Sequence, residues 1–126
     1  MGQKKKIMII DDEVGLTNML KLNLEQTGKY EVLVDNSGVK CLEVARKYLP
    51  DLILLDVLMP DMEGRLTASF LQASKETRNV PIVFLTATVS KEQAEAGHKV
   101  LEGCECLSKP VTMDVLLACI ERNIRK

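Results

Sequence analysis

Three short apolar runs in this chain each end in a polar residue that can take part in chemistry. They are residues 7–10 before Asp11 and Asp12, residues 52–55 before Asp56, and residues 82–85 before Thr86. Strands covered on both faces of a parallel sheet have such continuous apolar stretches, whereas strands with one solvated face alternate. The runs therefore indicate buried parallel strands, and the polar residues that follow them would meet at one edge of the sheet.

Segments typical of strands and helices alternate along the whole chain. The expected strands cover residues 6–10, 30–34, 51–55, 80–86 and 103–107. The expected helices cover residues 14–26, 37–48 with Ser37 as N-cap, 65–74, 90–98 with Ser90 as N-cap, and 113–124 after Thr112 as N-cap. Met59, Pro60 and Gly64 indicate a loop between the third strand and the third helix. Five strands alternating with five helices predict an α/β fold, a five-stranded parallel sheet with helices on both faces.

The composition limits the kind of protein this can be. A length of 126 residues suits one domain, residues 1–126 with a core of about 5–125. The net charge of −1 argues against a nucleic-acid surface or a basic membrane patch. No apolar run approaches the roughly 20 residues of a membrane span, so a cytoplasmic location is expected. The four cysteines form no C-x-x-C pair, and buried thiols are favoured over a zinc site or disulfides.

A fourth polar strand end completes a candidate site. Residues 103–108 lead into Lys109 and Pro110, so Lys109 would join the aspartates and Thr86 at the same edge. Clustered carboxylates suit a divalent metal, and a hydroxyl with an amine suits a phosphoryl group. Each residue also has a plain structural interpretation: the Asp pair as a helix start, Thr86 as a helix cap, and Lys109 as a surface lysine.

Four segments in this order resemble the receiver domain of two-component response regulators, including the stand-alone regulators of chemotaxis. They are IMIIDDE at 7–13, LLDVLMPDMEG at 54–64, FLTA at 84–87 and SKP at 108–110. The resemblance covers about residues 5–125 and implies a flavodoxin-like, doubly wound fold. It also implies a phosphorylation-dependent switch that is not a turnover enzyme.

The resemblance implies a role for each site residue. Asp56 matches the phosphoacceptor, Asp12 the direct Mg²⁺ ligand, and Asp11 its neighbour that acts on the metal through water. The backbone carbonyl of Leu58 matches a further metal ligand. Its apolar side chain cannot orient a hydrolytic water, which predicts slow self-dephosphorylation.

The remaining roles concern binding of the phosphoryl group and transmission of the signal after phosphorylation. Thr86, Ala87 and Lys109 match the residues that bind the phosphoryl group, and the Lys109–Pro110 peptide is expected to be cis. The family commonly has tyrosine or phenylalanine three residues before the lysine, where this chain has Cys106. A thiol has no ring to rotate, so switching is expected to involve shifts around residues 90–98.

The implied partners are a sensor histidine kinase or a histidine phosphotransfer protein, with an output domain or target protein downstream. His98, the sole histidine, lies in the wrong element to be an internal donor. One alternative is a phosphohydrolase of the haloacid dehalogenase type, but that class needs D-x-D after the first strand, where this chain has adjacent aspartates. Another is a docking module that resembles a receiver domain without switching.

Overall fold

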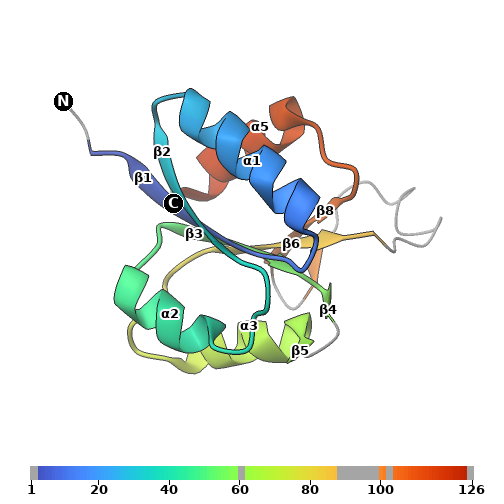
Figure 1. Ribbon diagram of the computed structural model, residues 1–126. Coiled ribbons are helices and arrows are strands. Elements are labelled where there is room, and N and C mark those ends of the chain that lie inside the picture. Colours follow the sequence, from blue (N-terminus) through green and yellow to red (C-terminus); the bar gives the residue numbers. More distant parts are fainter. Residues whose placement is uncertain (1–2, 60–61, 88–99, 102–103, 125–126) are drawn as a thin grey trace.

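A central sheet with helices on both sides organises the molecule (Figure 1). The computed structural model describes residues 3–59, 62–87, 100–101 and 104–124. Within these residues the main sheet has the order β2-β1-β3-β6-β8-β7. Its strands are β1 (Lys5–Ile10), β2 (Tyr30–Asp35), β3 (Leu52–Asp56), β6 (Ile82–Thr86), β7 (Val100–Leu101) and β8 (Cys104–Ser108). The first four neighbouring pairs are parallel, which confirms the predicted five-stranded parallel sheet. The short antiparallel edge strand β7 was not predicted.

Among the described residues, two helices cover each face of the sheet. The helices α1 (Val14–Gln26) and α5 (Met113–Ile124) lie on one face, and α2 (Cys41–Tyr48) and α3 (Gly64–Ala73) lie on the other. The bounds of α1 are those predicted, and α3 is displaced by one residue from its prediction. The helix expected over residues 90–98 lies outside the described residues.

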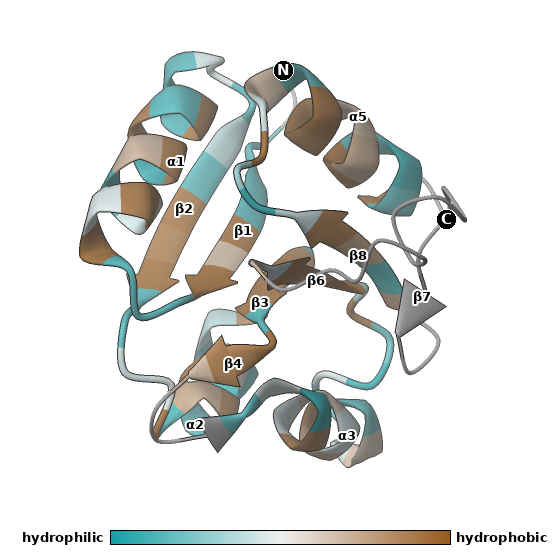
Figure 2. Ribbon diagram, turned by 90° about the vertical axis from the view of Figure 1, so that its right-hand side faces the viewer, coloured by the Kyte–Doolittle hydropathy of each residue, from teal (hydrophilic) through white to brown (hydrophobic). Residues whose placement is uncertain are grey.

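The core has two halves, one on each side of the sheet. Ile7 and Ile9 of β1 pack with α1 and α5, whereas Met8 and Ile10 pack with α2 and α3. All four side chains are completely buried. Successive strand residues point to opposite faces, so a strand covered on both sides must be apolar at every position. Figure 2 shows the same arrangement as hydrophobic strands between the two helix layers.

The strand register brings the polar strand ends to one edge. Ile10 pairs with Leu55, so Asp11 and Asp56 follow neighbouring residues of β1 and β3. On the other side of β3, Asp56 pairs with Leu85, which precedes Thr86. Lys109 is joined to this edge by a 2.9 Å hydrogen bond from its backbone N–H to the carbonyl of Thr86.

Helix α2 begins later than predicted. Ser37 was expected to be its N-cap, but the helix starts at Cys41 after Lys40, and the Lys40 side chain makes no capping hydrogen bond. The backbone N–H groups of Ser37 and Gly38 instead donate to Asp35 Oδ1, at 3.0 and 2.9 Å. Gly38 has a φ of 74°, a value that glycine adopts readily. The chain therefore makes a turn first and the helix follows.

The described residues after Asp56 form two short strands where a loop was predicted. Leu58–Met59 forms β4 and Met62–Glu63 forms β5, and the two pair antiparallel. Glu63 then starts α3, because its side chain accepts from the backbone N–H groups of Arg65 and Leu66. Thr112 was correctly predicted before α5, where its hydroxyl accepts from the N–H of Val115 at 3.4 Å.

Candidate functional site

Three carboxylates gather at the carboxyl edge of the sheet. One ligand oxygen from each of Asp11, Asp12 and Asp56 lies within 4.8 Å of the others. Asp11 and Asp56 are buried, and Asp12 is exposed. Carboxylates this close repel one another, so an arrangement of this kind favours a bound cation. The structure thus brings together the three aspartates that were predicted to lie at one edge of the sheet.

Asp11 is the most enclosed member of the cluster. Its Oδ1 accepts a 2.9 Å hydrogen bond from the backbone N–H of Glu13. Its Oδ2 is buried and has no hydrogen-bond partner among the described residues, although Lys109 Nζ lies 2.8 Å away as an ion pair. The Asn36 side-chain amide donates to the Asp11 carbonyl at 2.8 Å and fixes the local backbone. Asn36 was not predicted as a site residue, because nothing in the sequence marks its turn as part of this edge.

Asp56 is held at the end of β3 in a setting that disfavours its charge. Its Oδ1 accepts from the backbone N–H of Leu58 at 3.2 Å, and Lys109 Nζ lies 3.5 Å from its Oδ2. Burial raises the pKa of Asp56 to about 6, and the Asp11 carboxylate acts in the same direction against the lowering effect of Lys109. At neutral pH the carboxylate is still largely ionised and remains able to act as a nucleophile.

Lys109 is the cation of the site. Its ammonium contacts Asp11, Glu13 and Asp56 with distances of 2.8, 2.6 and 3.5 Å from Nζ to the nearest carboxylate oxygens. Burial alone would lower its pKa, but the interactions with the Asp11, Glu13 and Asp56 carboxylates together outweigh burial and hold the pKa above its usual value. The contact with Glu13 was not predicted; from the sequence Glu13 is an acid at a helix start.

The other predicted site residues lie near this cluster. Thr86 is buried at the end of β6, and Ala87, which follows it, is exposed. Leu58 is in β4 with its side chain 63% exposed. The Lys109–Pro110 peptide is cis, as the resemblance implies. Cys106 is half-buried on β8, where it pairs with Phe84 of β6 and packs against the core on the α2 and α3 side.

The donor set of the cluster fits Mg²⁺. Hard divalent cations prefer oxygen ligands, and Mg²⁺ typically takes a few carboxylates and keeps several waters. Asp11, Asp12 and Asp56 offer only oxygen ligands. Among the described residues the buried Asp11 Oδ2 accepts no hydrogen bond, so a cation could occupy that position. The residues present therefore suit the metal.

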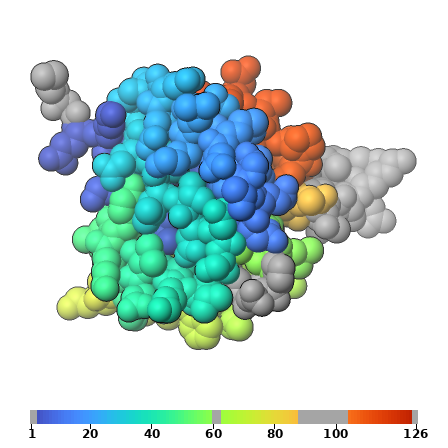
Figure 3. Space-filling model, viewed as in Figure 1, coloured from blue at the N-terminus to red at the C-terminus, as the bar shows by residue number. Residues whose placement is uncertain are grey.

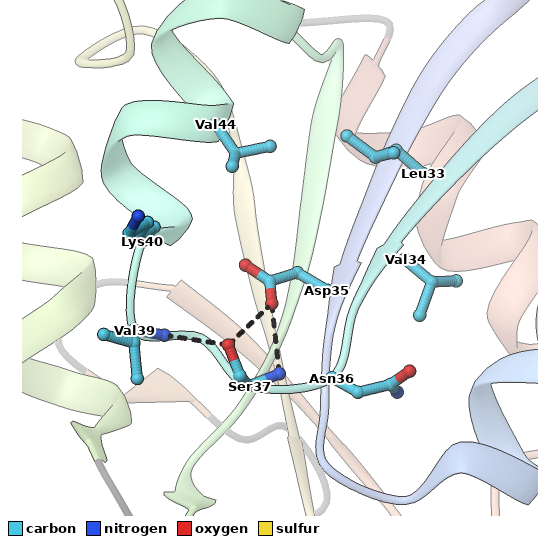
Figure 4. A pocket seen from close by; sticks show the side chains of 8 residues that line it. All are labelled: Leu33, Val34, Asp35, Asn36, Ser37, Val39, Lys40 and Val44. Carbon is cyan, nitrogen blue, oxygen red and sulfur yellow. Dashed lines mark hydrogen bonds between the residues drawn. The ribbon is translucent and has the colours of Figure 1, made fainter.

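A surface pocket of about 550 Å³ lies beside the site rather than in it. It is lined by the end of β2, the following turn and the start of α2, next to α1 on the face shown in Figure 3. In Figure 4 the Asp35 carboxylate is turned toward Ser37 within the turn, and Val34, Val39 and Val44 supply much of the apolar lining. No member of the carboxylate cluster lines this pocket.

Fold and site together define a doubly wound α/β domain with an acidic, lysine-containing cluster at the carboxyl ends of its strands. The model of the response regulator receiver domain matches residues 7–121. The chain belongs to this family, whose members are signalling switches of two-component systems.

Individual relatives agree with this assignment. The polar-differentiation response regulator DivK of Brucella ovis is 30% identical over 118 residues, which cover 93% of this chain and 94% of DivK. The chemotaxis protein CheY4 of Vibrio cholerae has a TM-score of 0.81 at 29% identity, with 95% of this chain and 98% of that one covered.

A third comparison supports the fold alone. The receiver domain of a sensor histidine kinase from Pseudomonas aeruginosa has a TM-score of 0.83 at 24% identity, covering 98% of this chain and all of that one. That structure has a magnesium ion coordinated in its active-site cleft. In the part of the chain that the structure describes, no helix is long and apolar enough to cross a membrane.

Proposed function

We propose that this chain accepts a phosphoryl group on Asp56 in a Mg²⁺-dependent reaction and signals through the resulting change of conformation. The observation that carries the proposal is the position of Asp56. It is buried at a strand end, and one of its carboxylate oxygens lies within 4.8 Å of an oxygen of Asp11 and of Asp12. Its Oδ2 lies 3.5 Å from Lys109 Nζ. A nucleophile, a place for a metal and a cation are therefore within reach of one incoming phosphoryl group.

Each residue has a distinct part in the proposed reaction. An oxygen of Asp56 forms a bond to phosphorus while the bond from phosphorus to the leaving group breaks, and the leaving group departs with that electron pair. Asp11, Asp12, Asp56 and the carbonyl of Leu58 would hold Mg²⁺, which would supply positive charge to offset the negative charge of the phosphoryl oxygens. Lys109 offsets negative charge on those oxygens, and Thr86 and Ala87 contribute a hydroxyl and a backbone N–H at the adjacent strand end.

The proposed donor is a phosphohistidine on a sensor histidine kinase or a phosphotransfer protein in the cytoplasm. The receiver serves an output domain or a target protein, and it is a switch and not a turnover enzyme. Leu58 supports a long-lived phosphoryl group, because an exposed apolar side chain beside Asp56 cannot orient an attacking water. Cys106 has no aromatic ring that could rotate when Asp56 is phosphorylated. We therefore propose that the change of conformation involves shifts around residues 90–98.

Intact-mass analysis tests the proposal directly. The protein is incubated with acetyl phosphate and Mg²⁺, and the same reaction is run with EDTA. A phosphoryl adduct is expected with Mg²⁺ only, and Asp56→Asn is expected to abolish it. Asp114→Asn is the matched control, because Asp114 is an exposed carboxylate outside the cluster, and it should leave the adduct unchanged. A folded protein that gains no mass under these conditions would instead favour the docking module.

A further inference from the structure

The Lys109 ammonium lies among three carboxylates. Its Nζ lies 2.6 Å from Glu13 Oε1, 2.8 Å from Asp11 Oδ2 and 3.5 Å from Asp56 Oδ2. An ammonium group has three N–H donors and no acceptor. A phosphoryl oxygen on Asp56 would therefore compete with these carboxylates for the Lys109 ammonium.

Burial decides which carboxylate can leave. The Asp11 side chain is 0% exposed, and without Lys109 its Oδ2 would be a buried charge with no hydrogen-bond partner, which is costly. Asp56 is the group that would carry the phosphoryl. The Glu13 side chain is 56% exposed, so water can solvate its carboxylate as soon as it moves away. Glu13 is thus the exchangeable partner.

The backbone around Glu13 supports a specific role for its side chain. Glu13 is the N-cap of α1, with extended φ and ψ of −83° and 97°, yet its side chain makes no capping hydrogen bond. The glutamate at the same position of α3, Glu63, accepts hydrogen bonds from the backbone N–H groups of Arg65 and Leu66. The Glu13 carboxylate instead spans from the start of α1 to Lys109, which is 96 residues away in the chain.

We infer that Glu13 is a positioning residue that holds the Lys109 ammonium in the unphosphorylated protein and competes with the phosphoryl group for it. The inference rests on the proposed function and adds a control on the rate at which Asp56 is phosphorylated. Loss of the Glu13 contact leaves Lys109 available for the incoming phosphoryl oxygens. An ion pair with one exposed partner contributes up to about 1 kcal/mol, so its removal is expected to raise the rate about two- to fivefold.

Two substitutions separate the contact from the charge. Glu13→Gln keeps the length of the side chain and removes its charge. Glu13→Asp keeps the charge but is one methylene shorter, so it is expected to lose the 2.6 Å contact with Lys109. Aspartate is also a favoured N-cap, which protects the fold of this variant. Glu43→Gln, at an exposed acid in the first turn of α2, is the matched control and should behave as wild type.

The rate of adduct formation is measured by intact mass over a range of acetyl phosphate concentrations, with saturating Mg²⁺ and fixed ionic strength. The ¹⁵N signal of the Lys109 side chain is followed in the same proteins without donor or metal. We expect both Glu13 variants to be phosphorylated faster than wild type, and the Lys109 ammonium to exchange hydrogen faster in both. An effect confined to position 13 would support the contact, since a general loss of surface charge would also alter Glu43→Gln.

Several results would overturn the inference. A higher rate in Glu13→Gln alone would mean that charge repulsion acts without the contact, and wild-type rates in both variants would mean that Glu13 has no role. An unchanged Lys109 signal in both variants would exclude the contact itself. Failure of every protein, wild type included, to gain an adduct would overturn the proposed function and the inference with it, whereas equal rates would overturn the inference alone.

Discussion

At the scale of single residues, the ionised Asp56 carboxylate is the group of the carboxylate cluster that most lowers the free energy of unfolding when no metal is bound. Its pKa is raised from 3.8 to about 6, chiefly by burial and next by Asp11. A raised pKa means that the folded protein binds a proton more tightly than the unfolded chain does. The contribution of Asp56 to the free energy of unfolding is therefore most favourable below about pH 4. It becomes less favourable as the pH rises from about 4 to about 6, and it stays at this lower level at higher pH.

Asp56→Asn should remove this dependence. Without metal, we expect the variant to exceed wild type in free energy of unfolding at pH 7.5, by an amount on the order of 2 kcal/mol, and to lose most of that advantage at pH 4. Urea unfolding at both pH values in EDTA measures the difference. A variant that is less stable than wild type at pH 7.5 would show that the Asp56 carboxylate is stabilised by Lys109 more than it is destabilised by burial.

The same scale shows what the sequence could predict about the site. Asp11, Asp56 and Lys109 were predicted together because each follows a strand, and parallel strands end at a common edge. The contact of Glu13 with Lys109 was not predicted, because it depends on which way an exposed side chain turns at the start of α1. Neither composition nor periodicity contains that information.

At the scale of elements, the position of Asp56 depends on how closely the start of α3 approaches the end of β3. A Cβ on Gly64, the first residue of α3, would lie 2.6 Å from the carbonyl oxygen of Asp56 and 2.7 Å from the Cα of Val57. Both are backbone atoms that cannot move aside cheaply. The N–H of Gly64 also donates to the carbonyl of Val57 at 2.9 Å, so the two segments are joined at this point.

Gly64→Ala should therefore damage both stability and the site. We expect a loss of about 1–3 kcal/mol, typical of an overpacked contact, together with weaker Mg²⁺ binding. Gly15→Ala is the matched control: nothing lies within 4 Å of its Cβ, and alanine should stabilise α1 by up to about 1 kcal/mol. Urea unfolding and a Mg²⁺ titration followed by NMR check both variants. Unimpaired Mg²⁺ binding in Gly64→Ala would mean that α3 does not position Asp56.

The elements that the sequence predicted well are those with a strong period. The helix α1 has apolar residues at helical spacing, and its bounds were predicted residue for residue. The short pair β4 and β5 was missed because two-residue strands leave no period to detect. Ser37 is not the N-cap because the backbone N–H of Ser37 donates to the Asp35 carboxylate and forms a turn there. Polar side chains near a helix start can compete for the same backbone groups in this way.

At the scale of the whole molecule, the strand order places the site. The chain runs from β1 to β2 at one side and then crosses to β3 on the other side of β1. Asp11 follows β1 and Asp56 is the last residue of β3. These two strands flank the change of direction, which is where doubly wound sheets bind ligands. The class of fold could be predicted from alternating elements alone, and the edge strand β7 could not.

Binding of Mg²⁺ to this edge should stabilise the entire fold, because the unfolded chain does not assemble the three carboxylates. With free Mg²⁺ at about a hundred times its dissociation constant, we expect the free energy of unfolding to rise by about 2.7 kcal/mol. Thermal unfolding against Mg²⁺ concentration measures this, with NaCl at equal ionic strength as the control. Asp12→Asn should weaken the effect, and an equal response to NaCl would show screening of charges without a metal site.

The most direct test of the central claim is to locate the phosphoryl group. An acyl phosphate on aspartate is reduced by borohydride to homoserine, so the phosphorylated protein can be reduced, digested and sequenced by tandem mass spectrometry. We predict homoserine at residue 56 alone, in samples treated with both acetyl phosphate and Mg²⁺. Homoserine at Asp11 or Asp12, or its absence from a protein that carries a phosphoryl adduct, would contradict the assignment of Asp56 as the phosphoacceptor.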